Sequence, residues 1–335
     1  MPLILGRENV LSIYRDAAQR GWVLPAFNAE NLTTTEAILA AARELAAARH
    51  EPDLPIIVGI TRTYDHRSQS AFYTHTRDAQ LGLDLFMADL RVLTGPGSPF
   101  ADLRVMVHLD HIQWRDDLDF LESADLGAFS SIMYDASTLP LDENIARTRA
   151  FMKQHGGKLM VEGACDEIGE ASEGQPIKLT SPDMADRYAR ETGVDVIVAN
   201  LGTEHRAGAA DLKYHGDLAR DIRARIGPRI CLHGTSSVPP GQVRGLFNDG
   251  VCKVNIWTAL ERDSAPALLR DQLQNAARVV GPKRAAAWQA EGLLGPAADV
   301  RGGVSLAHYS TTRRQEIIFG EMKRIVTEFL NLWYV

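Results

Sequence analysis

Eight short apolar runs, separated by segments with the apolar period of a helix, constrain the fold of this chain more than any other feature. The runs cover residues 22–28, 54–61, 104–111, 129–137, 158–164, 194–202, 229–234 and 251–258. Helical patterns lie between them at 33–49, 78–93, 115–126, 141–156, 181–193, 216–227 and 239–250. Strands that alternate with helices predict a parallel sheet, and eight such repeats predict a (β/α)₈ TIM barrel of the α/β class.

The length of 335 residues is compatible with one such domain. We expect a single domain over residues 1–335, with the barrel at about 20–265 and a C-terminal helical extension at about 266–335. Helical patterns at 259–280 and 312–333 supply this extension. Long polar or Gly/Pro-rich insertions at 62–77, 94–102 and 164–180 account for most of the remaining length.

Composition and charge limit the classes of binding partner and the cellular compartments that we expect for this chain. A net charge of −7 with 24% charged residues does not favour binding to nucleic acid or to an anionic membrane. No window reaches the ~18 to 20 apolar residues of a membrane span. The N-terminus "MPLILGRENV" lacks the pattern of a signal peptide, and Cys165, Cys231 and Cys252 are an odd, unclustered set. We therefore expect a cytoplasmic protein.

Polar side chains end each of the eight apolar runs. Because βα loops converge at the carboxyl ends of barrel strands, these side chains are expected to meet in one mouth. They are Asn28, Thr61, His108, Asp110, His111, Asp135, Glu162, Asn200, Thr203, His205, His233, Asn255 and Thr258.

Three of these strand-end residues, His111, His205 and His233, are able to give imidazole nitrogens to one metal ion. Three protein ligands and an open position are typical of catalytic zinc. Histidines satisfied by ordinary hydrogen bonds are the alternative. The sequence "CLHGTSSVPPGQ" similarly predicts either an anion site or a plain helix cap.

Five ordered motifs give the chain a resemblance to a known family. "LPAFNAENLTTTEAILAAA", "VHLDH", "NLGTEH", "CLHGTSS" and "CKVNIWT" follow the order and spacing of class II, metal-dependent ketose-bisphosphate aldolases, over about residues 22–265. The family includes fructose-bisphosphate and tagatose-bisphosphate aldolases. Membership implies one catalytic Zn²⁺ ion, or another divalent metal in its place, held by the residues that match the family's ligands: His111, His205 and His233.

The resemblance also assigns roles to other residues. Asp110 matches the acid/base that exchanges the proton of the C4 hydroxyl, and Asn255 matches the asparagine near the enediolate. His108 lies on the same strand face as Asp110 and is expected to orient the site. The residues expected to bind substrate or its phosphate are Asn28, Gly234, Ser236, Thr258 and Arg206.

The chain departs from the family at the fifth strand. Glu162 keeps the first glutamate of the "E-x-E-L-G" motif and is a catalytic candidate, but Ala164 replaces the second. The glutamate of the following loop is not in its motif. The residues that could replace it are Asp166, Glu167, Glu170 and Glu173.

Further departures fall near the expected phosphate. Arg206 follows His205 where the family has glycine, and Lys213 is the next lysine. Ser237 and Trp257 replace a glycine and an aspartate. Arg206 is either a bidentate anion ligand or a surface residue.

The sequence therefore predicts a metal-dependent lyase that reversibly cleaves a ketose through a zinc-stabilised enediolate. The products would be dihydroxyacetone phosphate, or a related ketone, and an aldehyde. A metal-dependent isomerase or epimerase is an alternative, and so is a non-catalytic homologue with a binding role. The expected partners are a sugar or sugar phosphate and further copies of the chain, as a homodimer or homotetramer, because family members assemble in this way.

Overall fold

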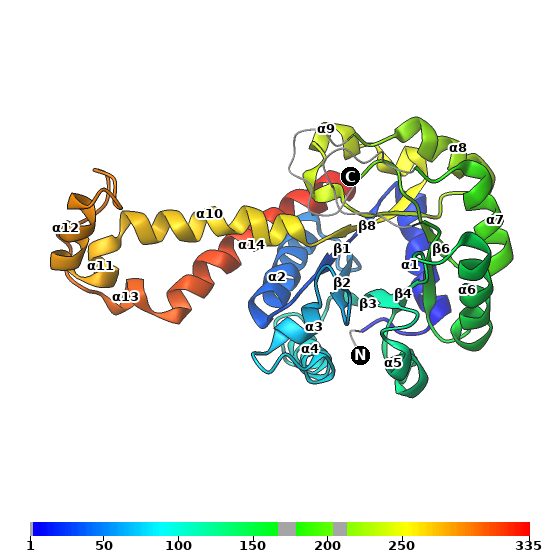
Figure 1. Ribbon diagram of the computed structural model, residues 1–335, viewed down its shortest axis with the longest axis horizontal. Helices are drawn as coiled ribbons and strands as arrows, with labels where there is room; N and C mark the ends of the chain where they lie inside the picture. Colours follow the sequence, from blue (N-terminus) through cyan, green and yellow to red (C-terminus); the bar gives the residue numbers. More distant parts are fainter. Residues whose placement is uncertain (1–2, 167–178, 204–212) are drawn as a thin grey trace.

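Eight parallel strands close into a barrel in the computed structural model, which describes residues 3–166, 179–203 and 213–335 (Figure 1). β1 pairs with both β2 and β8, so the sheet has no edge. The strands are β1 Leu24–Asn28, β2 Pro55–Thr61, β3 Arg104–Gln113, β4 Ser131–Asp135, β5 Met160–Ala164, β6 Val196–Val198, β7 Ile230–Leu232 and β8 Val251–Ile256. The predicted TIM barrel is confirmed.

Burial on both faces explains the composition of these strands. Every residue of β1, β2, β4, β5, β6 and β7 is buried. A strand covered by helices outside and by opposite strands inside reads as a continuous run of Val, Ile, Leu and Met, without polar alternation. The polar residues are consequently concentrated at the carboxyl ends, where the barrel opens.

Helices cover the outside of the barrel, and the predicted positions of most of them are confirmed. The helices outside the C-terminal extension are α1 Arg7–Arg20, α2 Leu32–Arg49, α3 Gln69–Tyr73, α4 Ala79–Leu93, α5 Leu118–Ser123, α6 Leu141–His155, α7 Pro182–Thr192, α8 Gly216–Ile226 and α9 Pro240–Val243, with 3₁₀ turns η1 Leu126–Ala128, η2 Thr235–Ser237 and η3 Leu246–Asp249. Several begin with a side-chain cap: Asn31, Asp78 and Ser181 accept from backbone N–H groups of the first turn.

The prediction of one helix at 239–250 is wrong. The segment forms α9 and the separate 3₁₀ turn η3. Gly245 lies between the two segments and explains the break, since a glycine costs about 1 kcal/mol relative to alanine inside a helix. The pattern at 259–280 is also interrupted, at Asn275.

The C-terminal helices form an arm that extends well beyond the barrel (Figure 1). α10 Thr258–Gln274 leads outward, α11 Ala276–Val280, α12 Pro282–Ala290 and α13 Leu306–Tyr309 lie at its end, and α14 Thr311–Trp333 returns. The end of the chain packs on the barrel: Trp333 Nε1 donates to the Val243 carbonyl at 2.8 Å, and the rings of Tyr334 and Trp22 stack at 4.7 Å.

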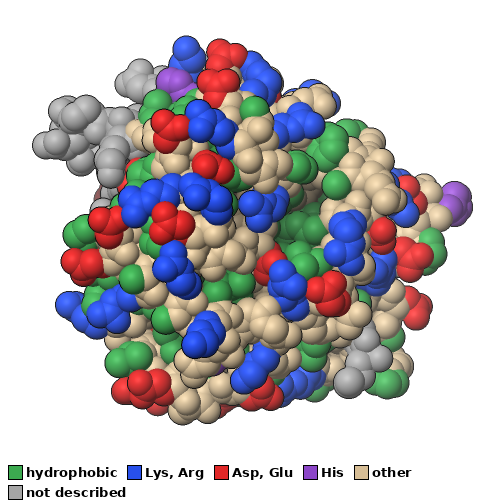
Figure 2. Space-filling model, turned by 90° about the vertical axis from the view of Figure 1, so that its right-hand side faces the viewer, with side chains coloured by type: hydrophobic (Ala, Val, Ile, Leu, Met, Phe, Trp, Pro, Cys, Tyr) green, Lys and Arg blue, Asp and Glu red, His purple; other side chains and the backbone are tan. Residues whose placement is uncertain are grey.

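Charges on the surface are mixed in sign. On the side that carries α6, α7 and α8, basic and acidic side chains are interspersed (Figure 2). Arg187 on α7, for example, contacts Asp142 of α6 at 2.5 Å and Glu191 at 2.9 Å. Among the described residues, no helix is both long and apolar enough to cross a membrane.

Candidate active site

A bulge in β3 brings two adjacent residues of the "VHLDH" motif to the barrel mouth. The pairing of β3 with β4 shifts between Leu109 and Ile112, so that Asp110 and His111 together oppose one residue of β4. His111 has a φ of 48°, an unusual conformation for a residue with a side chain. In a regular strand, neighbours point to opposite faces. The bulge therefore allows both side chains to line one pocket.

Two asparagine side chains hold the carboxylate of Asp110. Asn28 Nδ2 donates to Asp110 Oδ2 at 2.7 Å, and Asn255 Nδ2 donates to Oδ1 at 2.8 Å. These residues come from β1, β3 and β8, and all three are buried. Burial alone would raise the pKa of Asp110, but the charge of His111 and a hydrogen bond from His108 hold it well below its usual range. Asp110 is thus an oriented carboxylate.

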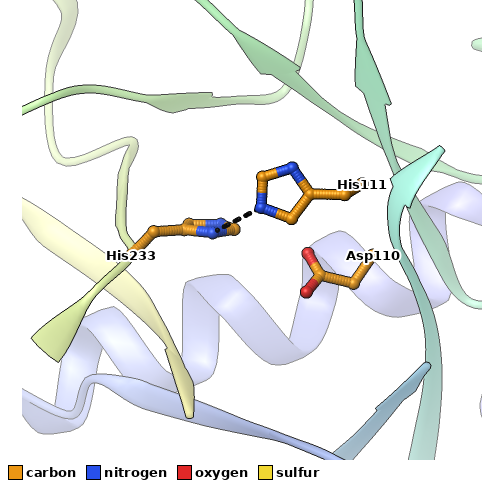
Figure 3. A group of neighbouring side chains, drawn as sticks. All are labelled: Asp110, His111 and His233. Atoms are coloured by element: carbon orange, nitrogen blue, oxygen red, sulfur yellow. Dashed lines mark hydrogen bonds between the residues drawn. The ribbon is translucent and has the colours of Figure 1, made fainter. Parts of the chain in front are cut away.

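His111 and His233 face each other across the mouth (Figure 3). His111 Nε2 lies 3.2 Å from His233 Nδ1, and the other ring nitrogen of His111 lies 2.9 Å from Asp135 Oδ2. Burial opposes a charge on His111, but the carboxylates of Asp110 and Asp135 outweigh it and raise the pKa of the imidazole. The backbone carbonyl of His233 accepts from Thr203 Oγ1 at 2.5 Å, which fixes the end of β7.

This donor set fits a divalent cation. One ligand atom from each of Asp110, His111 and His233 lies within 4.8 Å of the other two. Imidazoles such as those of His111 and His233 are ligands that zinc accepts, and the carboxylates of Asp110 and Asp135 beside them favour positive charge. Glu162, Cys231 and His233 form a second such group. That group suits a metal less well, because burial raises the pKa of the Cys231 thiol well above its usual range and Glu162 pairs with a lysine.

That lysine, Lys253, belongs to a buried network beneath the site that the sequence interpretation missed. Its Nζ lies 2.8 Å from Glu162 Oε1 and 3.0 Å from His108 Nε2. His108 Nδ1 contacts Ser131 Oγ at 2.8 Å, and its Nε2 lies 3.6 Å from Asp110 Oδ1. All the network's side chains are buried. His108 therefore lies next to Asp110, as expected. The position of Lys253 inside the apolar run "VCKVNIWT" is a signal that could have predicted a buried, paired lysine.

The loop between β2 and α3 contributes side chains to the site, although the sequence pattern predicted only a polar insertion there. The Tyr64 ring stacks on His111, with centroids 4.0 Å apart and an angle of 3° between the planes. The ring of His66 also lies beside Tyr64, with the centroids 4.7 Å apart. Tyr64 thus covers one face of a candidate metal ligand. The sequence offered no signal for this contact, because nothing local indicates where a loop folds back.

The pocket at the mouth opens to solvent, and its empty space is about 580 Å³ when the open space at the entrance is included. It brings together Asn28, Asp110, His111, His233, Gly234, Ser236, Asn255 and Thr258 from the expected site, with Thr61, Tyr64, His66, Arg67, Gln69, Ile256 and Trp257. Glu162 does not line it, since its carboxylate lies against Lys253.

Several expected residues lie outside the described part of the chain. They are His205, Arg206, Glu167, Glu170 and Glu173. Of the four acids considered as replacements for the family's loop glutamate, Asp166 is described. It is buried and lines a neighbouring pocket with His111 and Asp135.

Known proteins match this chain over most of its length. The family model "Fructose-bisphosphate aldolase class-II" matches residues 8–295. The chain is 27% identical over 271 residues to a D-tagatose-1,6-bisphosphate aldolase subunit GatY of Klebsiella oxytoca, covering 79% of this chain and 85% of that protein. It is 28% identical over 288 residues to a fructose-bisphosphate aldolase of Staphylococcus aureus, covering 85% and 91% respectively.

Solved structures show the same fold. A fructose-bisphosphate aldolase of Campylobacter jejuni superposes with a TM-score of 0.74 at 17% identity, covering 99% of this chain and 95% of that one. The YdjI aldolase of Escherichia coli K12 gives a TM-score of 0.66 at 17% identity, with coverage of 96% and 94%.

Proposed function

The chain belongs to the class II fructose-bisphosphate aldolase family, and on this premise we propose that it is a metal-dependent lyase that reversibly cleaves a ketose. The observation that carries the proposal is the carboxylate of Asp110, held by two amides beside the facing imidazoles of His111 and His233. An aldol cleavage requires a base and a means of stabilising charge next to a carbonyl, and this arrangement offers both.

Asp110 takes the proton from the substrate hydroxyl whose carbon becomes the aldehyde. Its two oxygens each accept from an amide, which fixes the carboxylate plane and leaves lone pairs for the substrate. The low pKa keeps the group ionised before the reaction. In the direction of synthesis, the same carboxyl returns the proton. The electrons of the broken C–C bond pass to the ketone fragment as an enediolate.

His111 and His233, with His205 from outside the described residues, would hold the metal. A divalent ion bound there, zinc in our proposal, would polarise the substrate carbonyl and would stabilise the developing negative charge by several kcal/mol. Asp135 accepts from His111 and orients its ring, and the hydrogen bond of that imidazole lowers the pKa of Asp135 to about 2 against the opposing effect of burial. Such carboxylate partners raise the basicity of a ligating histidine.

Glu162 acts below the site and not on the substrate in this proposal. It neutralises Lys253, which in turn contacts His108, so that a charged network supports Asp110 from beneath. Breaking one member would leave a buried charge without its partner.

Asp110→Asn tests the proposal. We expect kcat for aldehyde release from ketose phosphates to fall by about 10²–10⁴-fold, the range typical of a general acid–base group, with folding and metal content unchanged. Asp116→Asn is the matched control, because Asp116 is an exposed carboxylate in the loop after β3. Undiminished cleavage by Asp110→Asn would refute the assignment.

The products distinguish the remaining alternatives. Two fragments identify a lyase, whereas one product of unchanged mass would identify an isomerase or epimerase. Purified protein that binds no metal and turns over no ketose would indicate a non-catalytic homologue.

We also propose that the protein is a single-domain cytoplasmic homodimer or homotetramer. Apolar side chains that lie exposed on the arm support self-association: Leu269, Leu273, Leu293, Val304 and Leu306. Light scattering of the purified chain measures the oligomeric state directly, and a monomer at micromolar concentration would contradict this part of the proposal.

A further inference from the structure

The ring of Tyr64 packs on the imidazole of His111, one of the candidate metal ligands. The two rings are nearly parallel, with 3° between their planes and 4.0 Å between their centroids. At its edge, His111 Nδ1 donates to Asp135 Oδ2 at 2.9 Å, and its Nε2 faces His233 Nδ1 at 3.2 Å. Contacts at the edge restrain the positions of the ring nitrogens, whereas a stacked ring restrains the plane in which they lie.

The backbone of His111 makes such support necessary. Its φ of 48°, within the bulge of β3, is sparsely populated by residues that carry a side chain. Conformations of this kind persist only where the surrounding structure holds them. Contacts from other segments must therefore keep the His111 side chain directed into the mouth.

The loop 62–68, which carries Tyr64, is closed by hydrogen bonds between its two ends. The backbone N–H of Thr61 donates to Gln69 Oε1 at 2.9 Å, and the backbone N–H of Gln69 donates to Thr61 Oγ1 at 2.9 Å. Ser68 Oγ donates to the carbonyl of Arg62 at 2.5 Å. Both Thr61 and Gln69 are buried. A loop with its ends joined in this way is a firm support for an aromatic ring.

Asp117, in the turn between β3 and α5, ties this loop to β3. Its side chain is fully buried. Arg62 Nη1 and Thr63 Oγ1, from the two residues before Tyr64, donate to Asp117 Oδ1 at 2.8 and 2.5 Å. The backbone N–H of Gln113, at the end of β3, donates to Asp117 Oδ2 at 2.8 Å. Hydrogen bonds to an ionised acceptor are the stronger kind. One carboxylate therefore fixes the loop against the strand that carries the metal ligand.

We propose that Tyr64 is a positioning residue: its ring, held in place through Asp117, sets the plane of the His111 imidazole and thereby the direction of the nitrogen that faces the metal. The inference rests on the proposed metal site. It adds to that site a residue from loop 62–68, which lies outside the five motifs of the family resemblance. Neighbours that orient a ligating histidine typically contribute about 10–100-fold in metal affinity.

Zinc titrations against a chromophoric chelator measure this contribution. In Tyr64→Leu the dissociation constant of zinc should rise about tenfold, because leucine has no ring face to stack on His111. Tyr64→Phe keeps the ring and should keep the affinity of the wild type. Tyr309→Leu, at an exposed position of α13, is the matched control. An unchanged dissociation constant in Tyr64→Leu, or an equal rise in Tyr64→Phe, would overturn the inference.

Thr63→Val tests the part that Asp117 plays. It removes one hydrogen bond to the carboxylate in nearly the same shape and leaves both stacked rings in the chain. Zinc should bind more weakly than in the wild type, but by a smaller factor than in Tyr64→Leu, because Arg62 still contacts Asp117. Unchanged zinc affinity would refute the role of Asp117.

Kinetics at saturating zinc separate positioning from direct contact with the substrate. Tyr64 lines the pocket, so contact with the ketose is the competing role. A residue that acts through His111 affects how tightly zinc is held, so excess zinc should restore kcat in Tyr64→Leu and leave KM unchanged. A raised KM at saturating zinc would show that Tyr64 contacts the substrate and would overturn the inference.

Histidine-ring NMR of the metal-free protein tests the stacking without zinc. The ring current of Tyr64 should shift the ring protons of His111 upfield, and Tyr64→Phe should keep this shift whereas Tyr64→Leu loses it. His111→Gln identifies the signals among the ten histidines of the chain. A shift that persists in Tyr64→Leu would overturn the inference. Loss of the shift in a protein that binds no zinc would support the orientation of His111 by Tyr64 and refute the proposed metal site.

Discussion

Glu261 gives the protein a pH-dependent stability that one isosteric substitution should remove. Burial and the charge of Glu30 raise the pKa of this carboxyl from 4.5 to about 7 in the folded chain, although Arg67 opposes the change. The unfolded chain releases the proton near 4.5. Between these values the folded state binds more protons than the unfolded state, so the free energy of unfolding falls as pH rises.

The magnitude follows from the two pKa values. The difference corresponds to at most ~3.4 kcal/mol, at ~1.36 kcal/mol for each pH unit. Because Glu261 is only partly buried, solvent screening reduces this to about 1–2 kcal/mol. Glu261→Gln should therefore exceed the wild type in stability by about 1–2 kcal/mol at pH 8 and match it near pH 4.5.

Urea unfolding at several pH values, followed by circular dichroism, measures this difference. The contributions of other titrating groups cancel between wild type and variant. Glu316→Gln, at an exposed position of α14, is the matched control and should show no pH-dependent difference from the wild type. A stability gain in Glu261→Gln that does not grow between pH 5 and pH 8 would contradict this expectation, since it would show that the carboxyl does not titrate differently in the folded state.

Three other perturbations act on different parts of the site. Lys253→Met should lower the free energy of unfolding, measured in urea, by about 3–5 kcal/mol, because it leaves Glu162 charged and buried. Adding Glu162→Gln should recover part of this loss, and no recovery would contradict the role of the ion pair. In Gly59→Ala the new Cβ would lie 2.2 Å from Asn28 Oδ1, so we expect the amide of Asn28 to be displaced from Asp110. The kcat for aldehyde release should then fall roughly tenfold. Unchanged kinetics would show that this clash does not occur. Zinc at about 100 times its dissociation constant should stabilise the chelator-treated protein by ~2.7 kcal/mol, measurable as a higher unfolding midpoint, and an unchanged midpoint would argue against the metal site.

The barrel could be predicted because its signals are local. Each apolar run is long enough for one buried strand, and the helical period between runs is visible without any knowledge of distant contacts. The segment at 239–250 shows the limit of that signal, since apolar spacing there predicted a single helix, but the chain breaks the helix near Gly245. The convergence of Asp110, His233 and Asn255 was predictable for the same reason, because each follows or ends a strand and the barrel topology brings strand ends together.

The number of strands and the chemical groups that lie at the mouth could thus be predicted from the residues alone. Tertiary structure decided how those groups contact one another. The β3 bulge turns Asp110 and His111 to the same pocket, Tyr64 stacks on His111, and Lys253 pairs with Glu162. Each of these depends on register or packing between segments far apart in the chain. Such contacts leave no pattern in the sequence, whereas a buried strand does leave an apolar run, because most of its residues must be apolar to be buried.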